Sequence, residues 1–298
     1  MTAASPSCGP SPSTPHDRRR PPPPLGPRAA RPPLARLARP RSHPPRLLPR
    51  RPPAARTAAS TVAGPITRTV AVQALNSSAE THDLLAASGP ADAVVGWVDL
   101  ISSRCATRLD QLAAAPGGGT LRGLRHLAQD EPDPRWLVRP AVLRGLAAAA
   151  DRWLAFDLLV RGPQRPAALE AARLAPGTSF VIDHAGKPAI GAGEWEPWAS
   201  WITDMAALPN VTCKLSGLVT ECPPRPWSTK LIEPYARHVL ESFGADRVMF
   251  GSDWPVCLLQ ASYTEVLTLT VDLLDGASPT EREAVLGGTA RRVYRLGA

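Results

Sequence analysis

One short apolar run in this 298-residue sequence ends in an acid and could carry chemistry. Residues 247–250, Arg-Val-Met-Phe, have the length and composition of a buried strand. The turn and breaker residues that follow, 251–255, place Asp253 just beyond its carboxyl end. In parallel α/β folds, catalytic groups lie at that end of the strands. A second interpretation is that Asp253 only caps the next helix, because Asp is a favoured N-cap residue.

Charged and polar residues end other apolar runs in the same way. They are Arg125 and His126 in the run 121–126, Asp183 and His184 in 179–184, and Lys214 in 211–216 with Glu221 beyond it. A carboxylate and a histidine that face one cavity suit water activation, with an acid or a bound metal drawing the proton. A cation such as Arg125 would stabilise an oxyanion. This combination predicts hydrolysis of an ester or an amide.

Each of these residues also has a purely structural interpretation. A histidine after an apolar strand can be a hydrogen-bonded core residue, Asp183 and Lys214 could form a buried ion pair, and Arg125 could be a solvated loop residue. Four tryptophans at helical or turn spacing are expected to pack in the core or at its rim; they are Trp195, Trp198, Trp201 and Trp254. The joint pattern favours function for Asp253 and His184.

Apolar runs of strand length alternate with helical patterns along residues 69–298. The expected strands are 69–75, 94–100, 121–126, 156–160, 179–184, 211–216 and 247–250, and the expected helices are 78–87, 104–114, 134–150, 166–174, 195–207, 229–243, 263–274 and one from 280. This alternation predicts a parallel sheet covered by helices, an α/β fold of the (β/α)₈ TIM-barrel type. A barrel needs eight units, and no strand is readable in the first 60 residues. We therefore expect a barrel without its first strand, with two unpaired edges.

Composition separates the first 60 residues from the rest. They hold 12 of the arginines, one acid and 17 of the 35 prolines, so their net charge of +11 exceeds the whole chain's +8 and leaves −3 for the remainder.

Five widely spaced cysteines without a CxxC pair argue against a disulfide framework or a structural zinc site. No apolar run approaches the roughly 20 residues that span a bilayer. These observations favour a cytoplasmic protein.

Residues 1–64 form a Pro/Arg-rich low-complexity segment, and residues 65–298 form the predicted barrel domain. The segment lacks the aliphatic residues that would let it fold alone, which predicts disorder. A transit peptide should be Arg-rich, acid-poor and amphipathic, and the prolines at 21–24 prevent an amphipathic helix. The third interpretation is that the segment is translated out of frame.

Five blocks in order along residues 69–296 make the chain resemble the amidohydrolase-related family, in the branch of the L-fuconolactonase-like sugar-lactone hydrolases. The blocks are Val-Val-Gly-Trp-Val-Asp-Leu at 94–100, Leu-Arg-Gly-Leu-Arg-His at 121–126 with Gln-Asp-Glu-Pro at 129–132, Val-Ile-Asp-His-Ala-Gly-Lys-Pro at 181–188, Asn-Val-Thr-Cys-Lys-Leu-Ser-Gly-Leu at 210–218 and Val-Met-Phe-Gly-Ser-Asp-Trp-Pro at 248–255. The resemblance implies a barrel that opens a lactone ring in a small sugar-derived substrate.

The resemblance also implies roles for individual residues. Asp253, at the end of strand eight, would be the general base for the attacking water, and His184, at the end of strand six, would face the lactone or a metal. The expected substrate contacts are Arg125, His126, Lys187 and Trp254. Family members differ in metal use, so the expected cofactor is either none or one divalent ion, Zn or Mn, with His184 and Asp253 as its ligands.

One feature of the family pattern is missing, because the family's first strand ends in a His-x-His pair and this sequence has none there. Residues 18–35 can be back-translated so that a start one base later reads Val-Asp-Ala-His-His-His-Leu-Trp-Asp-Pro-Ala-Arg-Arg-Asp-His-Pro-Trp-Leu, which contains that signature. We hypothesise that the chain is out of frame up to a point between Arg56 and Arg68. The encoding nucleotides test this, since codons at Pro21 to Pro24 that do not read His in the shifted frame would exclude it.

If the chain is made as written, we expect little or no lactonase activity and poor stability, because barrel closure fails. One alternative is a metal-dependent decarboxylase or hydratase of amidohydrolase type on the same barrel. Another is an inactive barrel whose basic arm binds nucleic acid, although the arm has no aromatic residues to stack on bases. A membrane partner is not expected, and the sequence does not indicate an oligomeric state.

Overall fold

The computed structural model describes residues 67–87, 91–222 and 227–297, and the structural statements below concern these residues. The low-complexity segment, its frame and the domain boundary near residue 64 lie outside them, so those remain predictions.

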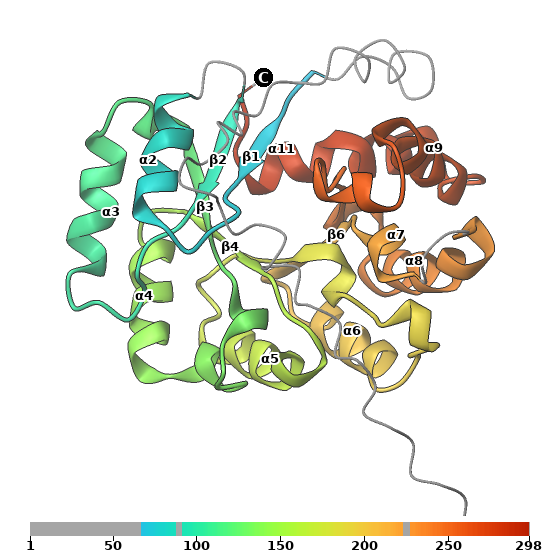
Figure 1. Cartoon of the computed structure of the whole chain (residues 1–298), viewed down its shortest axis with the longest axis horizontal. Coiled ribbons are helices and arrows are strands. Elements are labelled where there is room, and N and C mark those ends of the chain that lie inside the picture. Colours follow the sequence, from blue (N-terminus) through green and yellow to red (C-terminus); the bar gives the residue numbers. More distant parts are fainter. Residues whose placement is uncertain (1–66, 88–90, 223–226, 298) are drawn as a thin grey trace, which may run out of the picture. The chain divides into compact units, whose positions relative to one another are not determined.

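Seven parallel strands form one sheet in which each strand pairs with the next along the chain. They are β1 (Val70–Val72), β2 (Ala93–Gly96), β3 (Leu121–His126), β4 (Ala155–Leu158), β5 (Phe180–Ile182), β6 (Val211–Leu215) and β7 (Val248–Phe250). Figure 1 shows the sheet curling into a half-barrel with helices around its outside. Within the described residues, β1 and β7 each have one strand neighbour and do not pair with each other. The predicted TIM-barrel type of fold is confirmed, whereas a strand preceding β1 would fall outside the described residues, so its absence remains a prediction.

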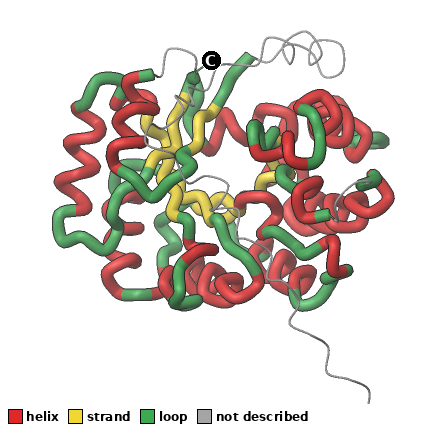
Figure 2. Tube along the Cα trace, viewed as in Figure 1, coloured by secondary structure: helices red, strands yellow, loops and turns green. Residues whose placement is uncertain are grey.

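Helices follow the strands along the chain and cover the outside of the curled sheet (Figure 2). They are α2 (Ser78–Ala86), α3 (Cys105–Ala114), α4 (Pro140–Ala150), α5 (Arg165–Leu174), α6 (Trp198–Ala206), α7 (Leu218–Glu221), α8 (Thr229–Phe243), α9 (Tyr263–Leu273), α10 (Pro279–Glu283) and α11 (Thr289–Val293). Local signals fix several ends. The Ser77 hydroxyl accepts a hydrogen bond from the Glu80 N–H at the start of α2, and Ser278 with Glu281 forms a capping box on α10.

Side chains alternate between the two faces of the sheet, as the period of a strand requires. Phe156 and Ile182 point outward into the main core beneath the helices. The neighbouring inward positions form a second, smaller apolar cluster inside the curl; its buried members are Val95, Ala155, Val181, Met249 and Tyr294. Tyr294 comes from the C-terminal segment, and its ring closes the inner space at the amino-terminal end of the strands. The interior is therefore apolar at one end and free to be polar at the other.

Two further sequence predictions can be compared with the described residues. Four cysteines are described, and all are buried and unpaired; they are Cys105, Cys213, Cys222 and Cys257. None of the described helices is both long and apolar enough to cross a membrane.

Candidate active site

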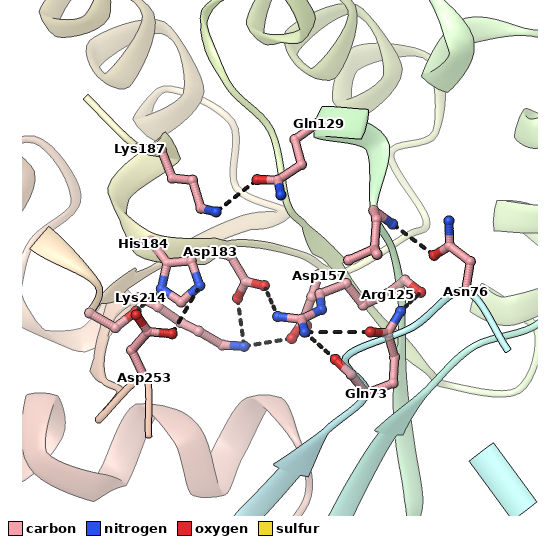
Figure 3. Close-up of polar contacts among 12 residues, drawn as sticks. Gln73, Asn76, Arg125, Gln129, Asp157, Asp183, His184, Lys187, Lys214 and Asp253 are labelled. Atoms are coloured by element: carbon pink, nitrogen blue, oxygen red, sulfur yellow. Dashed lines mark hydrogen bonds and ion pairs between the residues drawn. The ribbon is translucent and has the colours of Figure 1, made fainter. Parts of the chain in front are cut away.

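Three charged residues, two within β4 and β6 and one directly after β5, occupy the inward face at the carboxyl half of the half-barrel. Asp157, Asp183 and Lys214 each lie two residues beyond an inward-facing residue of their strand, so the same alternation turns them inward. Lys214 Nζ lies 2.5 Å from an Asp157 carboxylate oxygen and 2.7 Å from Asp183 Oδ1. Arg125 of β3 extends the chain of charges, with Nη1 2.8 Å from Asp183 Oδ2 (Figure 3). The predicted Asp183–Lys214 ion pair is confirmed.

Burial and close opposite charges together set the ionisation of this network. Burial lowers the pKa of Lys214, but the two adjacent carboxylates outweigh it and hold that pKa well above its ordinary value. Burial raises the pKa of Asp183, but Lys214 and Arg125 outweigh it and bring that pKa below its ordinary value. Asp157 is the exception, because burial dominates and raises its pKa. Lys214 and Asp183 are consequently charged across the neutral pH range.

Two uncharged groups complete the network at its ends. The Tyr294 hydroxyl donates to the Asp157 carboxylate, whose oxygens lie 2.9 and 3.0 Å away. The Gln73 carbonyl accepts a hydrogen bond from the Arg125 guanidinium, and the Gln73 side-chain amide donates to the Arg125 carbonyl at 3.0 Å. The Arg125 side chain is only 12 % exposed, so the interpretation as a solvated loop residue is wrong. Its anchored position makes Arg125 part of the wall of the site.

His184 and Asp253 face each other across the carboxyl ends of β5 and β7. His184 Nε2 lies 3.6 Å from Asp253 Oδ1 (Figure 3). Its Nδ1 lies 2.9 Å from the Ser216 hydroxyl. Both residues have φ of 54°, in the left-handed region that side chains with a Cβ rarely adopt. Such strain concentrates at functional sites. Gly217 leaves room for the imidazole, because a Cβ there would come within 2.6 Å of His184 Nδ1.

Burial moves the pKa values of this pair in opposite directions. It lowers the pKa of His184 to about 3, against a smaller opposing effect of Asp183, so the imidazole is neutral. It raises the pKa of Asp253 to about 7, with Lys187 opposing. A carboxylate that titrates near neutrality is suited to general-base work. The capping interpretation of Asp253 is wrong, since the next helix (Val256–Leu259) has Pro255 at its N-cap and no side-chain cap.

A second polar group lies above this pair. Lys187 Nζ donates to Gln129 Oε1 at 2.7 Å, and burial followed by the nearby Arg161 lowers the Lys187 pKa. Arg161 itself pairs with Glu221 at 3.2 Å. The charges of Asp253 and Glu221 act on the Lys187 pKa in the opposite sense and raise it. Lys187 forms no ion pair within the described residues, and its ammonium group can still donate two hydrogen bonds.

His126 belongs to a separate aromatic cluster. Trp97 Nε1 donates to its Nδ1 at 3.0 Å, its Nε2 lies 2.7 Å from Glu131 Oε1, and its ring stacks on Trp136 with centroids 3.8 Å apart. Both ring nitrogens are therefore engaged, which requires the neutral ring to carry its proton on Nε2. Trp254 is partly buried against the main core. Substrate contact by these two residues remains a prediction.

A divalent ion would find two donors here, His184 Nε2 and Asp253 Oδ1. The described part of the chain holds no group of three or more His, Cys, Asp or Glu side chains arranged to bind a metal. Three protein ligands are usual at a catalytic zinc ion. The residues described thus fit the implied metal incompletely, and the chemistry below is derived from side chains alone.

Several residues of the site were not predicted from the sequence; they are Gln73, Gln129, Asp157, Arg161, Ser216 and Tyr294. Asp157 had a usable signal, an acid within the apolar run 156–160 that an inward-facing partner must neutralise. The other five come from loops or from the chain end, where spacing along the sequence does not indicate which side chains meet.

Comparisons with known proteins give a consistent family relationship. A family model described as Amidohydrolase matches residues 19–296. An L-fucono-1,5-lactonase of Burkholderia ambifaria is 40% identical over 238 residues, covering 78% of this chain and 81% of that protein. An L-fucono-1,5-lactonase of Burkholderia multivorans is 41% identical over 68% of this chain and 71% of its own length. A crystal structure of an amidohydrolase from Burkholderia multivorans with bound zinc superimposes with a TM-score of 0.75 at 37% identity, covering 83% of this chain and 88% of that one.

Proposed function

Because the chain belongs to the amidohydrolase family, we propose that it hydrolyses a sugar lactone, L-fuconolactone or a related aldonolactone, with water activated by Asp253. The observation that supports this most is the facing pair of a neutral His184 and an Asp253 whose pKa lies near 7. The pair lies at the carboxyl ends of the strands, where barrels of this type place their chemistry.

The reaction needs a group that first accepts a proton and later donates it. Asp253 takes a proton from water as the water oxygen adds to the lactone carbonyl carbon, which gives a tetrahedral oxyanion. The ring C–O bond then breaks, and the leaving alkoxide takes that proton back from the Asp253 carboxylic acid, so that an aldonic acid is formed. A pKa near 7 allows Asp253 to serve in both directions.

Lys187 is placed to stabilise the oxyanion. Its ammonium group is the one cation of the site that forms no ion pair among the described residues, because Gln129 is an uncharged partner. A charge-assisted hydrogen bond to developing negative charge is stronger in the transition state than in the ground state. Lys187 is half-buried, and its hydrogen bond to Gln129 holds the ammonium group in place.

The charge balance of the site favours a neutral substrate. Arg125, Lys214 and Arg161 each have a carboxylate partner within 3.2 Å. A decarboxylase or a dicarboxylate hydrolase would need free cations for its substrate's carboxylates. Among the described residues of the site only Lys187 is available, and the charge of Asp253 lies near it. This argues for a polyhydroxylated lactone over the carboxylate substrates of the alternative function.

The experiment is a pH-indicator assay of acid release with L-fuconolactone and L-rhamnonolactone, beside an aromatic carboxylate that can lose CO₂. It is run on the chain as written and on one carrying the shifted-frame residues in place of 18–35. We expect lactone turnover in the second chain and little or none in the first, because the first lacks the family's first-strand histidines. Consumption of the aromatic carboxylate with no lactone turnover in either chain would contradict the proposal.

A further inference from the structure

A cavity opens at the amino-terminal ends of the strands, the end opposite to Asp253. Its volume is about 450 Å³. Ser179 and Thr212, from the starts of β5 and β6, contribute hydroxyl groups to its lining, and Arg247 lies just before β7. Arg292 and Arg295 flank Tyr294 in the C-terminal segment and line the same cavity. Three arginines therefore surround a space of the size of a small-molecule site.

None of these three arginines has a carboxylate partner among the described residues. Arg247 Nη1 donates to the Leu208 carbonyl at 3.1 Å, and Arg295 Nη2 donates to the Trp153 carbonyl at 2.7 Å. Arg292 donates to the backbone carbonyl of Asp246. Backbone carbonyls orient a guanidinium group without neutralising it, so the positive charge at this end remains uncompensated.

Other arginines of the domain show the usual arrangement. Arg165 is buried and lies 2.6 Å from Glu194, and Arg152 lies 2.8 Å from Asp110. Asp246 is the one acid in the lining of the cavity, and no ion pair joins its carboxylate to the three arginines in the described structure. Among the described residues, the three arginines of the cavity therefore lack the carboxylate partner that Arg165 and Arg152 have.

Arg122 adds a fourth positive charge beside this group. Burial, followed by repulsion from Arg122, lowers the pKa of Arg295. The Arg122 Nε atom is buried and has no hydrogen-bond partner among the described residues. Arg122 itself is not among the residues that line the cavity, so it contributes charge near the cavity and no direct contact.

We propose that this cavity binds a small oxyanion, such as a phosphate ester or a polycarboxylate. Guanidinium groups bind phosphate and carboxylate through paired N–H donors, and the Ser179 hydroxyl of the lining can supply a further donor. The lactone-hydrolysing site lies at the other end of the strands, so the proposal is independent of the reaction there.

The test is calorimetric titration of the full chain with inorganic phosphate and, separately, with citrate, at an ionic strength held constant with chloride. We expect saturable binding of at least one anion, weakened at least tenfold in the double variant Arg247→Gln with Arg292→Gln. The matched control is Arg237→Gln on α8, where Arg237 is exposed and pairs with Glu233, and it should bind as the unmodified chain does. Binding of phosphate alone assigns a phosphate ester, binding of citrate alone assigns a polycarboxylate, and binding of both assigns a general oxyanion site.

Absence of saturable binding by either anion, or equal affinity in the double variant, would overturn the proposal. If the double variant does not fold, the single variant Arg292→Gln replaces it with the same two criteria.

Discussion

The cations at the two ends of the half-barrel have different kinds of partner. At the carboxyl end, Lys214 pairs with the buried carboxylates of Asp157 and Asp183, and Arg125 pairs with Asp183. At the amino end, Arg247 and Arg292 contact backbone carbonyls. Paired charges position groups and cannot bind a charged ligand without breaking the pair, whereas unpaired charges are available. This criterion supports the proposal that the reacting groups of the carboxyl end are Asp253 and Lys187, the two groups outside the paired network.

The largest effect is expected from breaking the paired network. Replacing Lys214 by Met would leave Asp157 and Asp183 buried without their shared cation, which costs about 3–5 kcal/mol for an uncompensated buried charge. Urea unfolding at pH 7 measures this. The matched control is Lys230→Met, which removes an exposed lysine of α8 and should change stability by less than about 0.5 kcal/mol. Equal free energies of unfolding for the two variants would show that the ion pairs of Lys214 do not stabilise the fold.

Replacing Lys187 by Gln tests the cation that the network leaves out. The variant keeps a hydrogen-bond donor but removes the charge, and loss of a charge-assisted bond of about 1.5–3 kcal/mol predicts a decrease in kcat/KM of about 10- to 100-fold. The chain with the shifted-frame residues is the one to assay, with Lys230→Gln as control. An unchanged kcat/KM for a neutral lactone would remove Lys187 from the reaction.

The pH dependence follows from the raised pKa of Asp253. The base must be ionised, so kcat/KM should rise about tenfold per pH unit below about 7 and level off above it. His184, with a pKa of about 3, should add no second limb between pH 5 and 9. A profile that is flat from pH 5 to 9 would contradict the assignment of the base.

The raised pKa of Asp253 also predicts that ionisation of this residue lowers the free energy of unfolding. In the folded state Asp253 binds its proton more tightly than in the unfolded chain, so its contribution is fully present at low pH and is lost as pH rises through about 7. The Asp253→Asn variant should therefore be more stable than the unmodified chain at pH 8, and the difference should shrink toward pH 4. Unfolding midpoints at the two pH values decide this, with the exposed Asp204→Asn on α6 as control.

The smallest effect is expected from removing the Tyr294 hydroxyl, which joins the C-terminal segment to the charged network. Tyr294→Phe removes only the hydroxyl that donates to Asp157, while its ring still fills the inner cluster, so a loss of about 1 kcal/mol is expected. Thermal unfolding and kcat/KM at pH 7 would show a small decrease in the first and little change in the second. A loss in kcat/KM greater than tenfold would mean that the two ends are coupled through the network.

Elements governed by local pattern could be predicted from the sequence. The bounds of β3 and α8 agree with the expected runs 121–126 and 229–243, because apolar periodicity and turn residues determine them locally. Other strands are shorter than expected; β2 ends at Gly96, for example, although the apolar run continues to Leu100. Hydrophobicity does not indicate where pairing with the neighbouring strand stops.

The site was predictable only in part. Asp253, His184 and the Asp183–Lys214 pair follow from charged residues at the ends of apolar runs. The contact of Tyr294 with Asp157 joins positions 137 residues apart and depends on how the C-terminal segment returns to the sheet. The pairing of Lys187 with Gln129 depends on loop conformation in the same way. Such contacts arise from tertiary packing, which spacing along one sequence does not encode.

The most direct test of the central claim is steady-state hydrolysis of L-fuconolactone at pH 8 by the chain with the shifted-frame residues and by its Asp253→Asn variant. If Asp253 is the base, the variant should lose about 10²- to 10⁴-fold in kcat, while remaining folded and at least as stable as its parent. A variant that folds and retains more than a tenth of the parent's kcat would contradict the claim that Asp253 activates the water.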